Sequence, residues 1–191
     1  MKSKKFLSAT IIASGLLLAS CSNAEEEPAE EGTPGKPLEE EGSHEEMDHS
    51  SSGEVPDTLE EAEDPKYPVD SEATILTDHM PGMDGAIATI TGAYDTTAYE
   101  VSYTPTTGGD PVENHKWVVH EELEDPGEAP LEQGDEAVMN ATHMEGMEGA
   151  AATVDSAEQT TVYMISYVDT ETGDPVENHK WVTEAELEAA E

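Results

Sequence analysis

Apolar and polar side chains alternate along two stretches of the chain, residues 97–103 and 161–167. Alternation with a period of two is the pattern of a β-strand with one buried face. On that face each stretch carries a tyrosine, a branched aliphatic residue and a second tyrosine: Tyr99, Val101 and Tyr103, then Tyr163, Ile165 and Tyr167. We therefore expect each stretch to be a strand that packs its tyrosines against a core.

Shorter apolar runs flank these stretches and predict further short strands, at residues 74–76, 86–90, 116–119 and 180–183. Proline and glycine separate the runs and favour turns. A Glu/Leu segment closes each half of the pattern, at Leu123 and at Leu187, and predicts one helical turn. The expected fold class is mainly β, with two tandem modules that are either small antiparallel barrels of the SH3-like kind or compact sandwiches.

The second half of this pattern copies the first at a constant interval of 64 residues. The motif His-Met-x-Gly-Met at residues 79–83 returns at 143–147, and Asp-Pro-Val-Glu-Asn-His-Lys-Trp at 110–117 returns at 174–181. This indicates a tandem duplication with one β module per copy. The expected organisation is a signal peptide at residues 1–20, a disordered acidic tether at 21–70, a first module at 71–124, a linker at 125–134 and a second module at 135–191.

The first residues have the composition of an export signal. Three lysines precede an apolar run, residues 6–18, which is too short to span a bilayer as a helix. The run ends in Leu-Ala-Ser-Cys, which looks like a lipobox, a site at which the cysteine is lipidated. An ordinary secretory signal is the alternative, but Cys21 is the only cysteine in the chain. We expect a lipid on Cys21 to anchor the mature chain to the extracellular face of the cell membrane.

Charge and cysteine content limit the partners. The chain has 45 acidic and 7 basic side chains, which gives a formal net charge of −38. Such a chain is repelled by nucleic acid and by anionic lipid headgroups, so we expect no nucleic-acid partner. It attracts cations without specificity, and the same charge also favours solubility. With a single cysteine, neither an intramolecular disulfide nor a thiolate metal site is expected.

The tether is acidic and rich in proline, glycine and serine, which favours disorder. Within it, His44, Met47 and His49 lie in six residues together with three carboxylates. A flexible peptide could wrap a metal ion with such groups. A polar linker with incidental histidine and methionine explains the same spacing equally well.

The strongest candidate chemistry lies in the repeated motif, whose potential metal ligands are His79, Met80 and Met83 in the first copy and His143, Met144 and Met147 in the second. Thioether sulfur is a soft donor that suits Cu(I) far better than Zn²⁺, Ca²⁺ or Mg²⁺, and imidazole is also a good copper ligand. The motif falls between two predicted strands and is therefore expected in a loop. We favour metal binding over the alternative, in which the methionines fill a core.

His115 and His179 are the natural candidates for a further ligand, because each occurs in the long repeated segment. In the alternative, Asn-His-Lys forms a turn, and Trp117 and Trp181 anchor the core. His120 has no histidine counterpart in the second copy, so a role that both copies share cannot depend on it.

Motifs of common enzyme classes are absent from the sequence. There is no catalytic triad with a nucleophile elbow, no Gly-rich phosphate loop and no His-Glu-x-x-His. A multicopper oxidase would also need a cysteine ligand for its electron-transfer copper. We therefore expect no enzymatic activity.

The lipobox, the segment at residues 44–56, the duplicated His-Met-x-Gly-Met-x-Gly-Ala and the duplicated Asn-His-Lys-Trp-Val together resemble the YdhK-like lipoproteins of Gram-positive bacteria. The resemblance spans about residues 44–188. This family carries two copies of a small domain without an assigned enzymatic activity. One branch, the staphylococcal copper-binding lipoprotein CopL, is associated with copper resistance.

The resemblance implies a membrane-anchored extracellular lipoprotein that sequesters copper, with Cu(I) favoured, and so contributes to copper tolerance. Its expected partners are the metal ion, the membrane through the lipid, and other copper-handling proteins. The alternative is a non-catalytic surface module that recognises the cell wall or a partner protein. The two copies differ at residues 105–109 and at His120, so equivalence of the two sites does not follow from the repeat alone.

Overall fold

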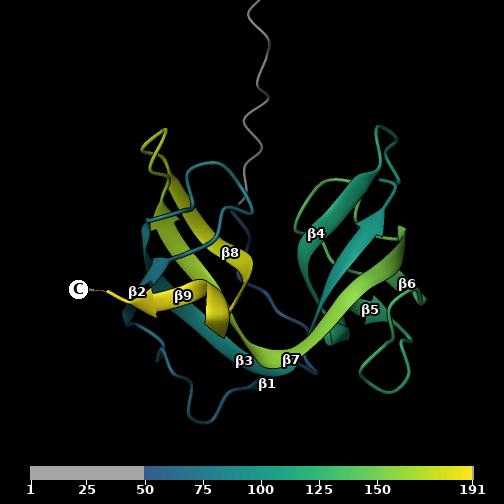
Figure 1. Ribbon diagram of the computed structural model, residues 1–191, viewed down its shortest axis with the longest axis horizontal. Coiled ribbons are helices and arrows are strands. Elements are labelled where there is room, and N and C mark those ends of the chain that lie inside the picture. The colour runs from purple at the N-terminus through teal and green to yellow at the C-terminus, as the bar shows by residue number, and fades with distance from the viewer. Residues whose placement is uncertain (1–49, 191) are drawn as a thin grey trace, which may run out of the picture. The chain divides into compact units, whose positions relative to one another are not determined.

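The computed structural model describes residues 50–190, which belong to one compact unit (Figure 1). The expected signal peptide, the lipidated Cys21 and the tether ligands His44, Met47 and His49 lie outside the described residues. Strands are the dominant regular structure of the described chain and its only helical elements are two short 3-10 turns, which confirms the mainly β fold class. Within it, no helix is long and apolar enough to cross a lipid bilayer.

The elements in chain order are β1 (Glu60–Glu61), β2 (Glu72–Ile75), β3 (Ile87–Tyr103), β4 (Val112–Val119), η1 (His120–Glu122), β5 (Leu123–Glu124), β6 (Glu136–Met139), β7 (Ala151–Val168), β8 (Pro175–Thr183), η2 (Glu184–Glu186) and β9 (Leu187–Ala189). The elements η1 and η2 are single turns of 3-10 helix, at the places where one helical turn was expected. Each element from β2 to β5 therefore has its counterpart in the second repeat, from β6 to β9.

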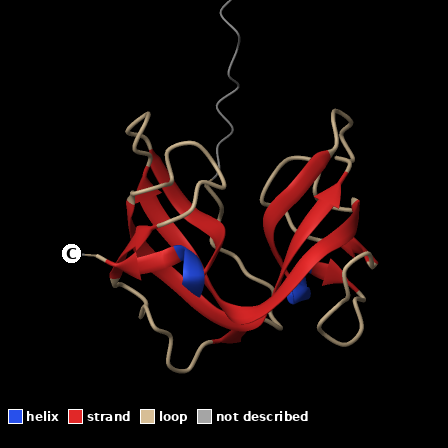
Figure 2. Ribbon diagram, in the orientation of Figure 1, coloured by secondary structure: helices blue, strands red, loops and turns tan. Residues whose placement is uncertain are grey.

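Two long strands, β3 and β7, run antiparallel side by side and organise the sheet (Figure 2). Their register pairs Ala88 with Tyr167 at one end and Tyr103 with Ala152 at the other. Between these ends Thr96 pairs with Thr160, its own counterpart in the other repeat. Turning the strand pair around its centre therefore exchanges the two repeats, as a two-fold axis does in a dimer.

Each end of the long strand pair carries a lobe that is built from both repeats. In the first lobe, β2 pairs with the start of β3 and with β9, and β8 pairs with the end of β7. In the second lobe, β6 pairs with the start of β7 and with β5, and β4 pairs with the end of β3. The expectation of one β module per repeat therefore needs correction. Because β3 and β7 continue past their centre, they carry the second half of each repeat into the other lobe.

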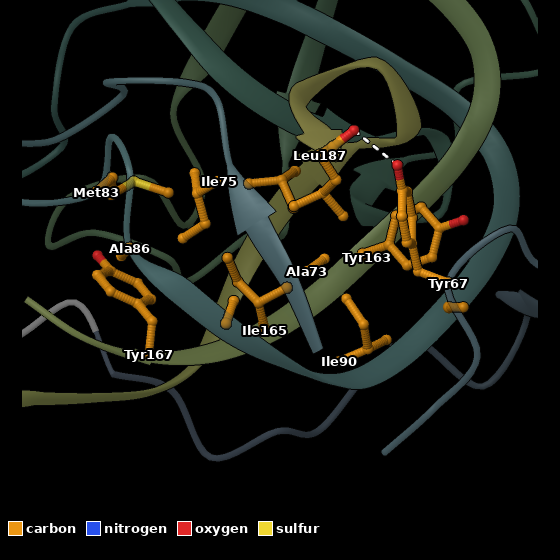
Figure 3. Close-up of a cluster of buried hydrophobic side chains, with 13 residues drawn as sticks. Tyr67, Ala73, Ile75, Met83, Ala86, Ile90, Tyr163, Ile165, Tyr167 and Leu187 are labelled. Atoms are coloured by element: carbon orange, nitrogen blue, oxygen red, sulfur yellow. Dashed lines mark hydrogen bonds between the residues drawn. The ribbon is translucent and has the colours of Figure 1, made fainter. Parts of the chain in front are cut away.

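The cores show the same exchange. The first lobe buries Tyr67, which precedes the repeats, together with side chains of both repeats that include Ile75, Met83, Ile90, Tyr163, Ile165, Tyr167 and Leu187 (Figure 3). The second lobe buries the complementary set, which includes Tyr99, Val101, Tyr103, Val118, Leu123, Met139, Met147 and Val154. A third cluster contains Leu59, Tyr94, Ala98, Trp117, Val119, Val162, Met164 and Trp181. Apolar burial stabilises a fold by roughly 25 cal/mol per Å², so each repeat depends on the other for its core.

The expected alternation is confirmed, because Tyr99, Val101 and Tyr103 and their three counterparts are buried. The short strands expected at residues 86–90 and 97–103 are joined in the single strand β3. The intervening residues interrupt the apolar pattern, yet they pair with β7 at the centre of the long strand pair. Gly92 lies in this passage, where a Cβ atom would come within 2.7 Å of the Tyr94 ring.

The final part of the expected tether, residues 50–70, is folded, so the prediction of disorder is wrong for these residues. Strand β1 pairs with β3. Leu59 and Tyr67 are buried, and the Tyr67 hydroxyl donates a hydrogen bond to the backbone oxygen of Leu187 at 2.7 Å (Figure 3). These two apolar side chains anchor the segment, and the acidic composition of the surrounding residues led to the prediction of disorder.

Candidate metal-binding cavity

One cavity of about 370 Å³ is lined by the repeated motifs of both halves of the chain. Its lining residues are Ser51, His79, Met80, Pro81, Val112, Glu113, Asn114, His115, Lys116, His143, Met144, His179 and Lys180. The first repeat contributes the loop after β2 and strand β4, and the second contributes the loop after β6 and strand β8. Four histidines and two methionines that were predicted as ligands therefore share a single cavity.

Each His-Met-x-Gly-Met motif forms a tight loop between two strands, as expected. In the first repeat, the Met83 backbone N–H donates to the Met80 oxygen at 3.4 Å, and the Gly85 N–H donates to the Ile75 oxygen at 2.9 Å. Gly82 turns the chain with a φ of 78°, in the left-handed region that glycine enters without strain. Equivalent bonds close the loop of the second repeat.

The two loops separate their methionines. Met80 and Met144 line the cavity, whereas Met83 and Met147 are fully buried in the cores of the first and second lobes. This placement corrects the expectation that Met83 and Met147 bind metal. Core packing accounts for both side chains, because the tight loop directs the second methionine of the motif into the core of its lobe.

A glutamate of the other repeat holds the histidine of each His-Met-x-Gly-Met motif. The Nε2 atom of His79 lies 2.7 Å from Glu186 Oε1, and that of His143 lies 2.7 Å from Glu122 Oε1. A carboxylate only accepts hydrogen bonds, so Nε2 is the donor in both pairs. The His143 and Glu122 side chains are 7% and 5% exposed, so their contact is almost completely shielded from water.

Tryptophans donate to the same glutamates across the two lobes. Trp117, on β4 in the second lobe, donates from Nε1 to Glu186 at 2.8 Å, and Trp181, on β8 in the first lobe, donates to Glu122 at 3.0 Å. A backbone N–H three residues before each glutamate donates as well, at 2.9 Å to Glu186 and 3.2 Å to Glu122. Each glutamate thus joins a histidine of one lobe to a tryptophan of the other.

The sequence reasoning missed Glu122 and Glu186. The sequence does contain a signal for them, because the two residues before each glutamate differ between the repeats while the glutamate and the following leucine are the same. We assigned this Glu/Leu segment only to a helical turn, and its place in η1 and η2 gives the carboxylates their position beside the cavity.

Both glutamates stay ionised in spite of their burial. Burial alone raises the pKa of Glu186, but donated hydrogen bonds from His79, Trp117 and the backbone outweigh it and hold this pKa at about 2. Burial also opposes ionisation of Glu122, but the interaction with His143 and the hydrogen bonds from the Trp181 and Val119 N–H groups outweigh it and lower the pKa of Glu122. Each carboxylate is therefore ionised at neutral pH and accepts a hydrogen bond from its histidine.

Three buried imidazole nitrogens of the cavity have no hydrogen-bond partner among the described residues: His79 Nδ1, His143 Nδ1 and His115 Nε2. Leaving a buried polar atom unpaired costs about 1–3 kcal/mol. Burial and the nearby His143 and His79 lower the pKa of His115 to about 4, so this ring is neutral at neutral pH. A neutral imidazole with an unpaired nitrogen is the form of histidine that binds metals.

The structure also brings His115 and His179 to the cavity, from β4 and β8. Each follows an asparagine in the left-handed region, Asn114 with a φ of 55° and Asn178 with a φ of 52°. The N–H of each asparagine donates to a serine hydroxyl on the adjacent long strand at 3.0 Å, where the strand register shifts. The tryptophans two residues later are buried. The histidines therefore line the cavity while the tryptophans anchor the core, although the two roles were considered as alternatives.

His120 has a different place. Its Nδ1 lies 2.9 Å from the Tyr99 hydroxyl, and its Nε2 lies 3.2 Å from the Gly127 oxygen. Neither contact has a counterpart at the cavity, so His120 does not belong to the candidate site.

The cavity combines imidazole and thioether donors, and its lining also includes the carboxylate of Glu113. Among residues 50–190, no three His, Cys, Asp or Glu side chains are grouped tightly enough to hold a metal ion by themselves. The ring centres of His115 and His143 are 6.4 Å apart, and the thioethers of Met80 and Met144 line the same space. The cavity can therefore offer imidazole nitrogen together with thioether sulfur, a combination suited to a soft metal.

Comparison with known proteins identifies the repeat. The model of a family described as a protein of unknown function (DUF1541) matches the chain twice, at residues 69–120 and 133–184. The chain is 60% identical over 146 residues to the uncharacterized protein YdhK of Bacillus subtilis (strain 168), and the match covers 76% of this chain and 71% of YdhK. Likeness to the staphylococcal copper-binding lipoprotein stays a prediction.

Solved structures agree with this match. A crystal structure of a DUF1541 family protein (ydhK) from Bacillus subtilis at 2.00 Å resolution is similar with a TM-score of 0.74 and 59% identity, over 77% of this chain and 100% of that chain. The solution NMR structure of the ydhK C-terminal domain gives a TM-score of 0.61 and 59% identity, over 64% of this chain and 92% of that chain. The chain belongs to the YdhK-like DUF1541 family and contains two copies of the family's repeat.

Proposed function

We propose that this protein binds copper as Cu(I) in the cavity and sequesters it outside the cell, which contributes to copper tolerance. The observation that carries the proposal is the set of unpaired nitrogens on His79, His115 and His143 beside the thioethers of Met80 and Met144. A bound metal ion would satisfy nitrogens that are otherwise buried without a partner.

The donor chemistry selects the metal. Zn²⁺, Ca²⁺ and Mg²⁺ prefer thiolate, imidazole or oxygen ligands, whereas thioethers suit Cu(I). Glu186 and Glu122 are occupied as hydrogen-bond acceptors of the motif histidines, which leaves the imidazoles, the thioethers and the carboxylate of Glu113 at the cavity. The formal net charge of −38 favours the approach of any cation but does not discriminate among cations.

A competitive Cu(I) titration tests the proposal. The chain from residue 22 onward is titrated against a chromophoric Cu(I) chelator, and tight binding is expected. Replacing Met80 and Met144 together by leucine should weaken that binding at least tenfold. The matched control replaces Met83 and Met147 by leucine, which should leave affinity unchanged because these side chains pack in the cores. Wild-type affinity in the Met80/Met144 variant would reject the thioether site.

The location of the protein is part of the same proposal. A lipid on Cys21 would hold the cavity at the extracellular face of the membrane, where other copper-handling proteins could receive the metal. Metabolic labelling with a fatty acid should mark the wild-type chain and not the Cys21→Ala variant. Labelling of the variant would show that the anchor lies elsewhere.

A second function, recognition of the cell wall or of a partner protein, is favoured by one observation. Lys116 and Lys180 line the same cavity, which gives it cationic groups within an acidic chain. An anionic group such as inorganic phosphate would then occupy the cavity, and NMR shifts of the two lysine side chains on phosphate addition would detect it. If phosphate shifts these signals and Cu(I) does not bind tightly, recognition of an anionic partner replaces copper binding.

A further inference from the structure

We infer that the two repeats build one metal site between them, not one site each, and that Glu122 and Glu186 position its histidines so that Nδ1 is the metal-binding atom. The inference rests on the proposed copper function and specifies the stoichiometry and the ligand atoms of that site. The sequence by itself favours the opposite conclusion, because it places a complete motif in each repeat.

The first argument is the sharing of supports between the repeats. His79 of the first repeat is held by Glu186 of the second, and His143 of the second is held by Glu122 of the first. Trp117 on β4 donates to Glu186, so this glutamate also contacts the second lobe. No motif histidine is positioned by its own repeat alone, and neither repeat could present its histidine without the other.

The second argument is proximity. His115 belongs to the first repeat and His143 to the second, yet their ring centres are 6.4 Å apart. Two imidazoles that share a metal ion through bonds of about 2 Å have ring centres roughly 6 Å apart. The separation of the two rings is therefore compatible with one shared ion in the cavity that Met80 and Met144 also line.

The third argument concerns the ring atoms. In both motif histidines, Nε2 donates to a glutamate and Nδ1 is buried without a partner in the described chain. A carboxylate on one ring nitrogen fixes the tautomer and leaves the lone pair on the other, which is a common arrangement around metal ions. Glu122 and Glu186 are themselves fixed by a tryptophan N–H and a backbone N–H, so they act as positioning residues and not as metal ligands.

The stoichiometry experiment uses the chain from residue 22 onward with His44→Ala, Met47→Leu and His49→Ala, which removes the potential ligands of the tether. One tight equivalent of Cu(I) is expected. His79→Ala and His143→Ala should each weaken that equivalent at least tenfold, and the double variant should lose less than the sum of the two logarithmic effects because both residues serve one ion.

Two tight equivalents, each lost with one histidine, would overturn the shared site while leaving the copper function intact. Weak binding only would overturn the copper function itself, and the shared site would fall with it. The two proposals therefore fail in distinguishable ways.

The positioning role has a readout that needs no metal. Long-range ¹H–¹⁵N NMR spectra of the metal-free chain should show unprotonated Nδ1 and protonated Nε2 in His79 and His143. Glu122→Gln and Glu186→Gln should disturb this tautomer in His143 and His79, respectively, and weaken Cu(I) binding by roughly 10–100-fold. Glu121→Gln is the matched control, because Glu121 accepts a hydrogen bond from Thr96 away from the cavity.

Protonated Nδ1 in the wild-type rings would overturn the assignment of the ligand atom. Unchanged affinity in both folded glutamine variants would overturn the positioning role. The wild-type spectrum remains decisive for the ligand atom even where a glutamine variant does not fold.

Discussion

Each lobe combines the first half of one repeat with the second half of the other, so the two lobes are built from equivalent parts. Only the first lobe is also wrapped by residues that precede both repeats. Tyr67 enters the core of the first lobe, whereas its counterpart in the second, Leu131, is only partly buried. Ser51 donates to the backbone oxygen of Asn178 on β8 at 2.6 Å, and Lys180 donates to the Glu54 oxygen. The second lobe has no equivalent wrap, because the residues that correspond to 50–54 form β4 itself.

At the cavity the two halves agree closely. The histidine–glutamate distance is 2.7 Å in both, and both glutamates accept a hydrogen bond from a tryptophan of the other lobe. The lobes differ at their outer edges and match at their shared centre. The histidine–glutamate–tryptophan contacts at the cavity are therefore the same in both repeats, whereas the contacts at the outer edges of the two lobes differ.

The largest expected asymmetry is at the cores. Tyr67→Ala should destabilise the chain by about 3–5 kcal/mol, because a large aromatic side chain leaves a cavity in the first core. Leu131→Ala should cost less, about 1 kcal/mol, since Leu131 is only partly buried. Urea denaturation of both variants measures the difference, and equal costs would show that the wrap adds nothing to the first lobe.

The methionines test the symmetric part of the comparison. Met83→Ala and Met147→Ala should each cost about 2–5 kcal/mol, because both side chains are fully buried in their lobes. Met80→Ala and Met144→Ala should cost far less, because these side chains line a cavity. Thermal unfolding of the four variants checks this pattern, and a large loss at Met80 or Met144 would assign that residue to the core after all.

Acid sharpens the comparison at the glutamates. The folded pKa of Glu186 is about 2, below its ordinary value of 4.5, so its stabilising contribution is complete above pH 4.5 and is lost as the pH falls towards 2. Glu186→Gln should therefore make stability less dependent on pH within this window. Chemical denaturation at several pH values measures the slope, and an unchanged slope would mean that Glu186 is not held as a carboxylate.

The smallest expected effect concerns the wrap at β8. Ser51→Ala removes the hydrogen bond that Ser51 Oγ donates to the Asn178 oxygen and the one that it accepts from the Gly53 N–H, and should cost about 1 kcal/mol. Amide hydrogen exchange should accelerate near residues 177–178 on β8 and stay unchanged at the corresponding positions of β4. Equal changes on both strands would indicate that the variant loosens the whole sheet.

The sequence predicted the strands better than their partners. Tyr99, Val101 and Tyr103 alternate as expected because burial on one face of a strand is a local property. Strand exchange is not local: the pairing of Thr96 with Thr160 depends on β3 continuing through a passage whose apolar pattern is interrupted. Periodicity cannot distinguish a repeat that folds on itself from one that pairs with its copy.

The candidate site was also predicted only in part, because several of its contacts join the two repeats. Residue type pointed to His79 and His143, and the structure places both at the cavity. Residue type could not distinguish Met80 from Met83, because both are methionines in one loop. Only the course of the loop places Met80 at the cavity and Met83 in the core. Glu122 was missed because its role arises from contacts with the other repeat, which no single motif contains.

The pairing of Thr96 with its own counterpart has a consequence for assembly. A chain with one repeat could form these strand pairs only by meeting a second copy, and it would then be a two-fold symmetric dimer with the cavity on its axis. The linker at residues 125–134 makes that encounter intramolecular, so the two halves meet at a high effective concentration that dilution does not lower. In such a molecule the completeness of the cavity is independent of how many copies the cell displays.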